Sequence, residues 1–206
     1  MSTSKRQEMG KWLDKGLCGL VPVYGEDGAN CTGLLFREHP PAMTKIKVHT
    51  FITRLAAFFQ KDIRLVREQA REITGQRSMN PLPINAHIIL VPFKMRKPIG
   101  KDDGAVGYFF SDMIHDVTED GDKVKVALKG GQKFQIIDTY HTAKRHISSA
   151  HQICFKLRPY DMGSPEYSSV CREYTGSYGL PATKGDILNL SRNIGVLVHK
   201  LDKLKI

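Results

Sequence analysis

Three stretches of the sequence concentrate lysine and arginine, whose side chains suit the recognition of phosphate groups. One is the segment around Pro98 and Gly100, the second spans residues 67–77, and the third is a pair of cations at residues 144–145. Cations on a loop or at a helix end can follow a nucleic-acid backbone or enter a minor groove. We therefore predict that these side chains contact DNA. The predicted contacts are Arg67, Arg71, Arg77, Lys94, Arg96, Lys97, Lys101, Lys144 and Arg145.

The charge of the whole chain favours the same class of partner. Its 206 residues include 31 Lys and Arg against 21 Asp and Glu, which gives a formal net charge of +10. Such a charge attracts phosphate backbones through counterion release, and it attracts anionic membranes as well. However, no window approaches the roughly 20 apolar residues of a membrane span, and the N-terminus has no apolar signal region. We expect a cytoplasmic protein that is associated with the nucleoid and has no membrane partner.

Metal-binding residue types are present, but their spacing does not predict a site. The four cysteines lie far apart without a Cys-x-x-Cys pair, so we interpret them as reduced thiols. His141, His146 and His151 follow one another in steps of five residues, and each step turns roughly 140° around a helix. These histidines therefore do not share one helix face. We expect no metal ion and no cofactor.

An enzyme is the least favoured interpretation. The sequence has no phosphate-binding loop, dinucleotide fingerprint, nucleophile elbow or zinc-protease motif. A metal-dependent nuclease would need clustered carboxylates, and acidic residues are present, but in turn-like contexts where they are common anyway. These residues are Asp102, Asp103, Glu119 and Asp120. We therefore expect no enzymatic activity.

The basic stretches must be positioned by a surrounding scaffold, and its central part has the pattern of strands. Between residues 83 and 139, short apolar runs alternate with turn signals, and Gly130-Gly131 predicts a hairpin turn. Three lysines in this region alternate with apolar residues as on a half-buried strand, and we interpret them as an ordinary solvated strand face. They are Lys123, Lys125 and Lys129.

A second hairpin and two helical patterns flank this strand region. Residues 17–36 read as an N-terminal hairpin, in which Pro22 favours an edge position. Apolar residues recur every three or four positions over residues 50–74, and Gly75 supplies a stop, which predicts one long amphipathic helix. Residues 140–157 also have a helical pattern.

Together these elements predict an α+β fold. It has a β-rich central domain with an N-terminal hairpin, one long amphipathic helix before the central strands, and C-terminal helices. Residues 1–158 form the predicted DNA-binding domain, residues 159–182 a linker or loop rich in Gly, Ser, Pro and Tyr, and residues 183–206 an amphipathic helix. The pattern leaves open whether this last helix packs back on its own domain or joins two chains.

The chain also carries an ordered set of short motifs. It begins with the hairpin sequence GLVPVYGEDGANCTGLLF, continues with an arginine-bearing segment before Pro83-Ile84, and then has the apolar run HIILVPF. A short basic loop, an aromatic strand at residues 107–109, a Gly-Gly hairpin and a helix with Gln and Arg follow. In this order and at similar spacing, over about residues 15–157, these motifs resemble the bacterial competence transcription factor (ComK-like) family.

Some positions depart from the pattern of that family. The sequence KDIRLVREQAREITGQR stands where the family has a Gly-Ser-Ser-Tyr and Gly-Arg signature, and Tyr108 stands where a tryptophan is usual. Residues 160–206 have no counterpart. These departures bear on the target sequence and on regulation more than on the broad class.

The resemblance implies a transcriptional activator of competence that binds double-stranded DNA. Members of the family recognise paired A/T-rich tracts, largely through the minor groove, as a homodimer or a dimer of dimers. The resemblance also implies two protein partners, RNA polymerase and a proteolytic adaptor that delivers the activator to a Clp protease. A-tracts have a narrow, strongly negative minor groove that draws in arginine and lysine, so the abundance of cations agrees with this mode of recognition.

Two other binding functions stay open. A LytTR-type DNA-binding domain has a similar strand pattern, but it reads successive major grooves, which DNA footprints distinguish. An RNA-binding module needs aromatic stacking platforms, although aromatic residues on strands are more often part of a core. The aromatic candidates are Tyr108, Phe109, Phe110 and Phe134.

Overall fold

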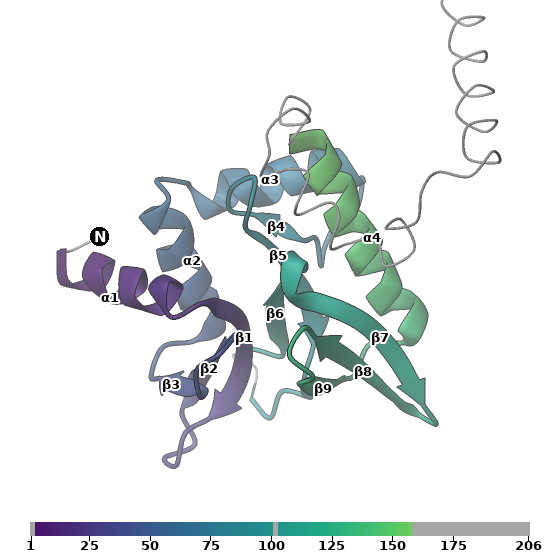
Figure 1. The fold of residues 1–206 in the computed structure, drawn as a ribbon, viewed down its shortest axis with the longest axis horizontal. Coiled ribbons are helices and arrows are strands. Elements are labelled where there is room, and N and C mark those ends of the chain that lie inside the picture. Colours follow the sequence, from purple (N-terminus) through teal and green to yellow (C-terminus); the bar gives the residue numbers. More distant parts are fainter. Residues whose placement is uncertain (1–2, 101–102, 158–206) are drawn as a thin grey trace, which may run out of the picture. The chain divides into compact units, whose positions relative to one another are not determined.

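The computed structural model describes residues 3–100 and 103–157, which belong to the first of two units of the chain, Met1–Pro159 (Figure 1). The linker predicted at residues 159–182 and the helix predicted at residues 183–206 lie outside the described residues. The elements are α1 (Thr3–Asp14), β1 (Leu17–Tyr24), β2 (Asn30–Phe36), β3 (Ala42–Thr44), α2 (Val48–Phe58), α3 (Ile63–Thr74), β4 (Leu82–Pro83), β5 (Ile89–Lys94), β6 (Val106–Phe110), the 3-10 helix η1 (Ser111–Met113), β7 (Ile114–Asp120), β8 (Lys123–Leu128), β9 (Lys133–Ile136) and α4 (Tyr140–Leu157). The predicted α+β class is confirmed.

Six antiparallel strands form the larger sheet, in the order β3-β2-β1-β6-β5-β4. β1 and β2 are the two arms of the predicted N-terminal hairpin, and Gly28 in its turn has a φ of 74°, which glycine adopts without steric cost. β1 also pairs with β6, so that Leu20 lies beside Tyr108. This pairing brings the N-terminal hairpin next to the predicted basic loop.

The prediction of an edge position for Pro22 is wrong, because β1 lies between β2 and β6. The sheet tolerates this proline because the ladder to β6 includes only Gly19 and Leu20. Beyond them, a Cβ atom added to Gly107 would lie 3.3 Å from Cδ of Pro22 and 2.9 Å from the carbonyl oxygen of Leu20. Pro22 therefore lies beyond the end of the hydrogen-bonded pairing between β1 and β6, where the absence of its amide hydrogen costs no bond to β6.

The smaller sheet contains three antiparallel strands in the order β7-β8-β9. The predicted Gly-Gly turn is confirmed, since Gly130 and Gly131 join β8 to β9 with φ values of 106° and 85°. Alternation along β8 is confirmed as well, because Val124 and Val126 are buried, whereas Lys123 is exposed. The lysines of β8 thus lie on the outer face of a half-buried strand.

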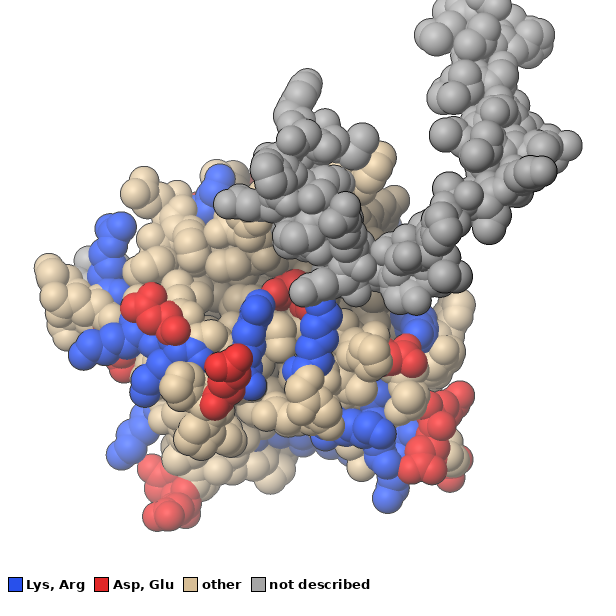
Figure 2. Space-filling model, viewed as in Figure 1, with Lys and Arg blue, Asp and Glu red and all other residues tan. Residues whose placement is uncertain are grey.

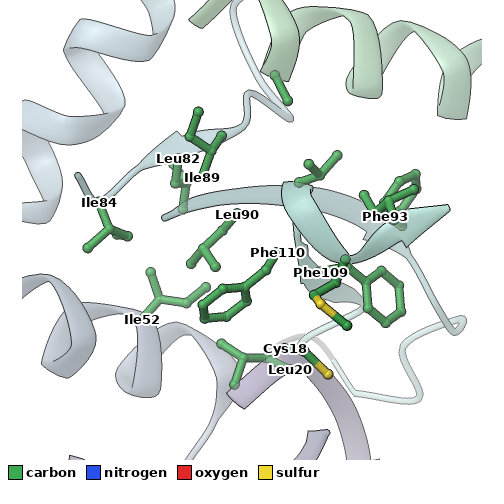
Figure 3. Close-up of a cluster of buried hydrophobic side chains, with 14 of the residues drawn as sticks. Cys18, Leu20, Ile52, Leu82, Ile84, Ile89, Leu90, Phe93, Phe109 and Phe110 are labelled. Atoms are coloured by element: carbon green, nitrogen blue, oxygen red, sulfur yellow. The ribbon is translucent and has the colours of Figure 1, made fainter. Parts of the chain in front are cut away.

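Adjacent residues on β5 and β6 point to opposite faces of the larger sheet and pack against different layers. On one face, Ile52 of α2 lies near Leu90 and Phe110 (Figure 3). On the other face, the ring centroid of Phe109 lies 5.3 Å from that of Phe134 in β9. Figure 1 shows α2 and α4 on either side of β6. The larger sheet is therefore covered by α2 on one face and by the smaller sheet and α4 on the other.

The predicted long helix over residues 50–74 is corrected to two helices, α2 and α3. The chain turns between them at Gln60, whose φ is 59°. Asp62 then caps α3, because its side chain accepts a hydrogen bond of 2.8 Å from the amide of Arg64. Both helices bury one apolar face, so apolar residues recur at helical spacing on both sides of the break. The sequence pattern therefore does not reveal the break. The predicted stop is confirmed, since Gly75 ends α3 with a φ of 68°.

Candidate nucleic-acid interface

The connection between β5 and β6 contains the first basic stretch, and one carboxylate holds it in place. Asp103 accepts hydrogen bonds from the amides of Ile99 (3.0 Å) and Gly100 (2.7 Å) within the connection. It also accepts from the hydroxyl of Tyr24 (2.8 Å) and the side-chain amide of Asn30 (2.5 Å) in the N-terminal hairpin. These bonds tie residues 99–100 to the ends of β1 and β2.

The donors around Asp103 also determine its ionisation. The amide of Gly100, the side chain of Asn30 and the hydroxyl of Tyr24, in that order, hold the pKa of this carboxyl well below its ordinary value of 3.8. Hydrogen bonds to the charged form favour that form. Asp103 is therefore an anion at neutral pH, and the loop attachment is complete under those conditions.

Arg96 contributes to the same attachment through internal contacts of its guanidinium, and its contact with DNA stays a prediction. Its guanidinium lies over the ring of Tyr24, 3.7 Å from the centroid, in a cation–π contact. Nε donates to the carbonyl of Gly104 (2.9 Å), and Nη2 donates to Oδ1 of Asn30. Arg96 thus holds the loop against the hairpin from inside.

Two further cations of this stretch are accessible. Lys94, at the end of β5, and Lys97 are both exposed, whereas Lys101 lies outside the described residues. The backbone of Lys94 is fixed, because its amide donates to the side chain of Asp138 (2.7 Å) and its carbonyl accepts from the amide of Ile137 (2.7 Å). Two solvent-facing cations are therefore presented on a backbone anchored at several points.

Contacts between β5 and α4 bring the third basic stretch close to the first. His146 of α4 is buried, and its Nδ1 lies 2.9 Å from the carbonyl oxygen of Pro92 in β5. Burial lowers the pKa of His146, and the positive charges of Arg145 and Lys94 lower it further against the opposite effect of Asp138. Arg145 is next to His146 on α4, and Lys94 follows Pro92 by two residues on β5, so both cations lie on the elements that this contact joins. The side chains of Arg145 and Lys94 are both exposed.

Lys144 has an internal partner. Its Nζ donates to Oδ1 of Asp116 in β7 at 2.7 Å, and its ammonium lies 5.4 Å from the ring centroid of Tyr140. The hydrogen bond raises the pKa of Lys144 and lowers that of Asp116. Both side chains are more than one-third exposed, so this ion pair adds at most about 1 kcal/mol to stability. Its main consequence is that the charge of Lys144 is offset.

Removing that partner should strengthen binding to DNA if Lys144 is a contact. The substitution Asp116→Asn leaves the charge of Lys144 uncompensated, and we expect tighter binding to an A/T-rich duplex, up to about eightfold at about 0.1 M salt, the effect of one further phosphate contact. Retardation assays measure this. Asp120→Asn is the matched control, because it frees Lys125, 2.8 Å away, on the solvated strand face. An equal gain in both variants, or no gain in Asp116→Asn, would count against Lys144.

The second basic stretch lies on and after α3. Arg67 and Arg71 are one turn apart on this helix, and Arg77 follows the capping residue Gly75. Arg67 is half-buried, and its positive charge lowers the pKa of Tyr108, although burial raises that pKa more strongly. Arg71 and Arg77 are exposed. Gln76, next to Arg77, donates to Oγ of Ser149 in α4 at 2.7 Å, so this stretch adjoins the helix that carries Arg145.

Figure 2 shows one face of the molecule, on which Lys and Arg side chains are spread over several elements with Asp and Glu between them. The described face is therefore not a single uninterrupted basic patch. The attraction of this face for phosphate groups depends more on the local arrangement of cations than on the total charge. Neighbouring Asp and Glu groups reduce that attraction at many positions.

The attachment through Asp103 gives a direct prediction for the basic loop. Replacing Asp103 with alanine removes the acceptor of four donors, so exchange of the Ile99 and Gly100 amides with solvent should accelerate by about tenfold or more. In the wild type, the folded-state pKa lies below the ordinary 3.8. The attachment is therefore complete at any pH above 3.8. It is lost at lower pH, as the pH falls through the folded-state pKa of Asp103.

Amide exchange followed by NMR measures both effects. A suitable control is Asp27→Ala, since Asp27 accepts from the amide of Ala29 (3.1 Å) in the hairpin turn instead of from the loop. Unchanged protection of Ile99 and Gly100 in the Asp103 variant would show that other contacts hold the loop.

The structure assigns roles to several residues that the sequence did not single out for this site: Tyr24, Asn30, Asp138 and His146. Two of the four carboxylates considered for a nuclease have other partners: Asp103 holds the loop, and Asp120 pairs with Lys125. The described residues include no group of three or more His, Cys, Asp and Glu side chains arranged to hold a metal ion. Cys18 and Cys31 are buried free thiols, and burial raises the pKa of Cys18 to about 11.

The aromatic candidates for RNA stacking lie mostly in the core. Phe109 is fully buried and Phe110 is 5% exposed, whereas Tyr108 and Phe134 are half-buried. A base cannot stack on Phe109 or Phe110 unless the larger sheet is disrupted. The structure therefore disfavours this set as an RNA-binding surface.

Comparisons with known proteins do not identify the chain, since no family model, no curated protein and no solved structure matches it. The resemblance to the competence transcription factor family stays a prediction. Within the part of the chain that the structure describes, no helix has both the length and the apolar character needed to cross a membrane.

Proposed function

We propose that this chain is a DNA-binding transcriptional regulator, an activator that recognises paired A/T-rich tracts through the minor groove and the phosphate backbone. The observation that carries the proposal is the anchored loop with exposed Lys94 and Lys97, next to the packed pair of β5 and α4 from which Arg145 is also exposed. An anchored backbone lowers the conformational entropy lost when these cations bind phosphates. The minor groove of an A-tract is narrow and has an enhanced negative potential, so it attracts inserted cations most strongly.

The proposal extends to the assembly and its surroundings. A protein that reads paired tracts needs two copies of its binding surface, so we propose a homodimer or a dimer of dimers in the cytoplasm, associated with the nucleoid. RNA polymerase and a proteolytic adaptor are the further partners that the family resemblance suggests. No enzymatic activity, cofactor or metal forms part of this function.

A retardation assay with the full chain and an A/T-rich duplex over a series of salt concentrations tests the proposal. We expect binding at low salt, with an affinity that falls steeply as salt rises because phosphate contacts release counterions. Absence of binding at low salt, or binding that does not depend on salt, would overturn it. Preference for single-stranded RNA would favour an RNA-binding protein, and protection of successive major grooves would favour the LytTR type.

The operator can be found by selecting bound duplexes from a random pool. Enrichment of two A/T tracts at a fixed spacing would support both the target class and the symmetry, because the spacing of half-sites reflects the geometry of a dimer. Enriched sequences without paired tracts would contradict that part of the proposal.

A further inference from the structure

The loop that carries Lys97 also presents an apolar side chain to solvent. Ile99 is 85% exposed, the largest exposed fraction among the large hydrophobic residues that the structure describes as exposed. The other members of this group with more than half of their surface exposed, Phe155, Leu65 and Met43, lie on helices or on an edge strand. Ile99 alone among these four lies on a loop.

The hydrogen bonds of the loop explain why this side chain points outward. The amides of Ile99 and Gly100 both donate to the carboxylate of Asp103, and the amide of Asp103 donates to the carbonyl of Gly100 at 3.1 Å. The polar backbone therefore faces the hairpin, and the side chain of Ile99 is left on the solvent side. Pro98 further restricts the chain just before it.

An anchored apolar tip that follows two exposed cations in the chain has the properties of a wedge for DNA. Minor-groove proteins insert apolar side chains between base steps, which unstacks the bases and bends the duplex, while cations hold the flanking phosphates. A single aliphatic side chain is enough to open one base step. Attachment to a membrane depends instead on the total buried apolar area, which one isolated Ile supplies poorly. Lys97 is two residues from Ile99, and Lys94 lies at the end of the preceding strand.

We propose that Ile99 enters the minor groove and wedges open a base step of an A/T-rich duplex, so that the chain bends its target. This inference rests on the proposed DNA binding, and it adds a mechanism for sequence preference. Pyrimidine–purine steps such as TA unstack most easily. The wedge therefore favours tracts in which such a step lies where Ile99 meets the groove.

The test uses the full chain and a duplex with two A/T tracts, labelled at its ends for energy transfer and carrying 2-aminopurine at successive positions. On binding of the wild type, we expect a bend of about 20–90° and a rise in 2-aminopurine fluorescence at one step. Ile99→Ala should lose most of both signals but keep the salt dependence of binding, because the cations are unchanged. Ile99→Leu should restore both signals, and Met43→Ala, on β3, should behave as the wild type.

The outcomes separate this inference from the function on which it rests. Salt-dependent binding without bending, or bending that is equal in the wild type and Ile99→Ala, would overturn the wedge and leave DNA binding intact. Absence of any binding to the duplex by the wild type would overturn both. Loss of binding to anionic lipid vesicles in Ile99→Ala, with no bending of DNA by the wild type, would show that the tip meets a membrane surface instead.

Discussion

The triple substitution of Lys94, Lys97 and Arg145 by glutamine is expected to weaken binding to an A/T-rich duplex by about 500-fold at about 0.1 M salt. Each phosphate contact contributes about 0.9 to the slope of log affinity against log salt, so three contacts change the slope by about 2.7. All three side chains are exposed, and the hydrogen bonds of Lys94 that fix the loop are made by its backbone. The fold should therefore be preserved.

A charge-matched control separates this surface from the charge of the whole chain. Lys5, Lys11 and Lys47 are also exposed, and they lie on α1 and just before α2. Replacing these three residues with glutamine changes the net charge equally, and we expect a loss of less than about tenfold from the weaker long-range field. Retardation assays over a salt series measure affinity and slope together. Equal losses in both triple variants would mean that overall charge, and not this surface, attracts DNA.

The substitution Phe109→Ala should have the largest effect on stability, a loss of about 3–5 kcal/mol. Phe109 has no exposed surface, and its ring lies 5.8 Å from that of Phe93 in β5 and 5.3 Å from that of Phe134 in β9, measured between centroids. Behind the ring, Gly19 leaves room for it, since a Cβ atom there would lie 2.9 Å from Cδ1 of Phe109. This ring fills the space between the two sheets, so its removal leaves a cavity that neither sheet can close alone.

Denaturation by urea measures this loss, which is a large part of the roughly 5–15 kcal/mol typical of a domain. Phe155→Ala is the matched control, because Phe155 is 77% exposed on α4 and should change stability by less than about 0.5 kcal/mol. A small effect for Phe109→Ala would mean that the two sheets do not share one core. DNA binding by the folded fraction of the variant should persist, since the cations lie elsewhere.

Local patterns predicted much of this fold because they depend on residues close together in the chain. The Gly130-Gly131 turn, the alternation along β8 and the stop at Gly75 follow from backbone preferences and burial over a few residues. The same reasoning failed at Gln60, where a break between two helices preserves the apolar spacing. It also failed at Pro22, because the position of a strand within a sheet depends on distant partners.

The candidate site was predicted only in part, for the same reason. Composition identified the basic stretches, and the structure turns the guanidinium of Arg96 inward. The predicted cations that it leaves exposed are Arg71, Arg77, Lys94, Lys97 and Arg145. Whether a cation is free depends on which carboxylate or ring lies beside it in space. Lys144 is offset by Asp116, from which it is separated by 28 residues in the sequence.

The sequence by itself determined the charge of this protein, its class of fold and the segments that carry cations, because these properties are sums or short-range periodicities. Only the tertiary structure decided which of those cations face solvent and how the basic loop is held. Asp103 meets Tyr24 across 79 residues and Asn30 across 73, and Lys94 meets Asp138 across 44. Such pairs form only after strands far apart in the chain have come together, so no local pattern encodes them.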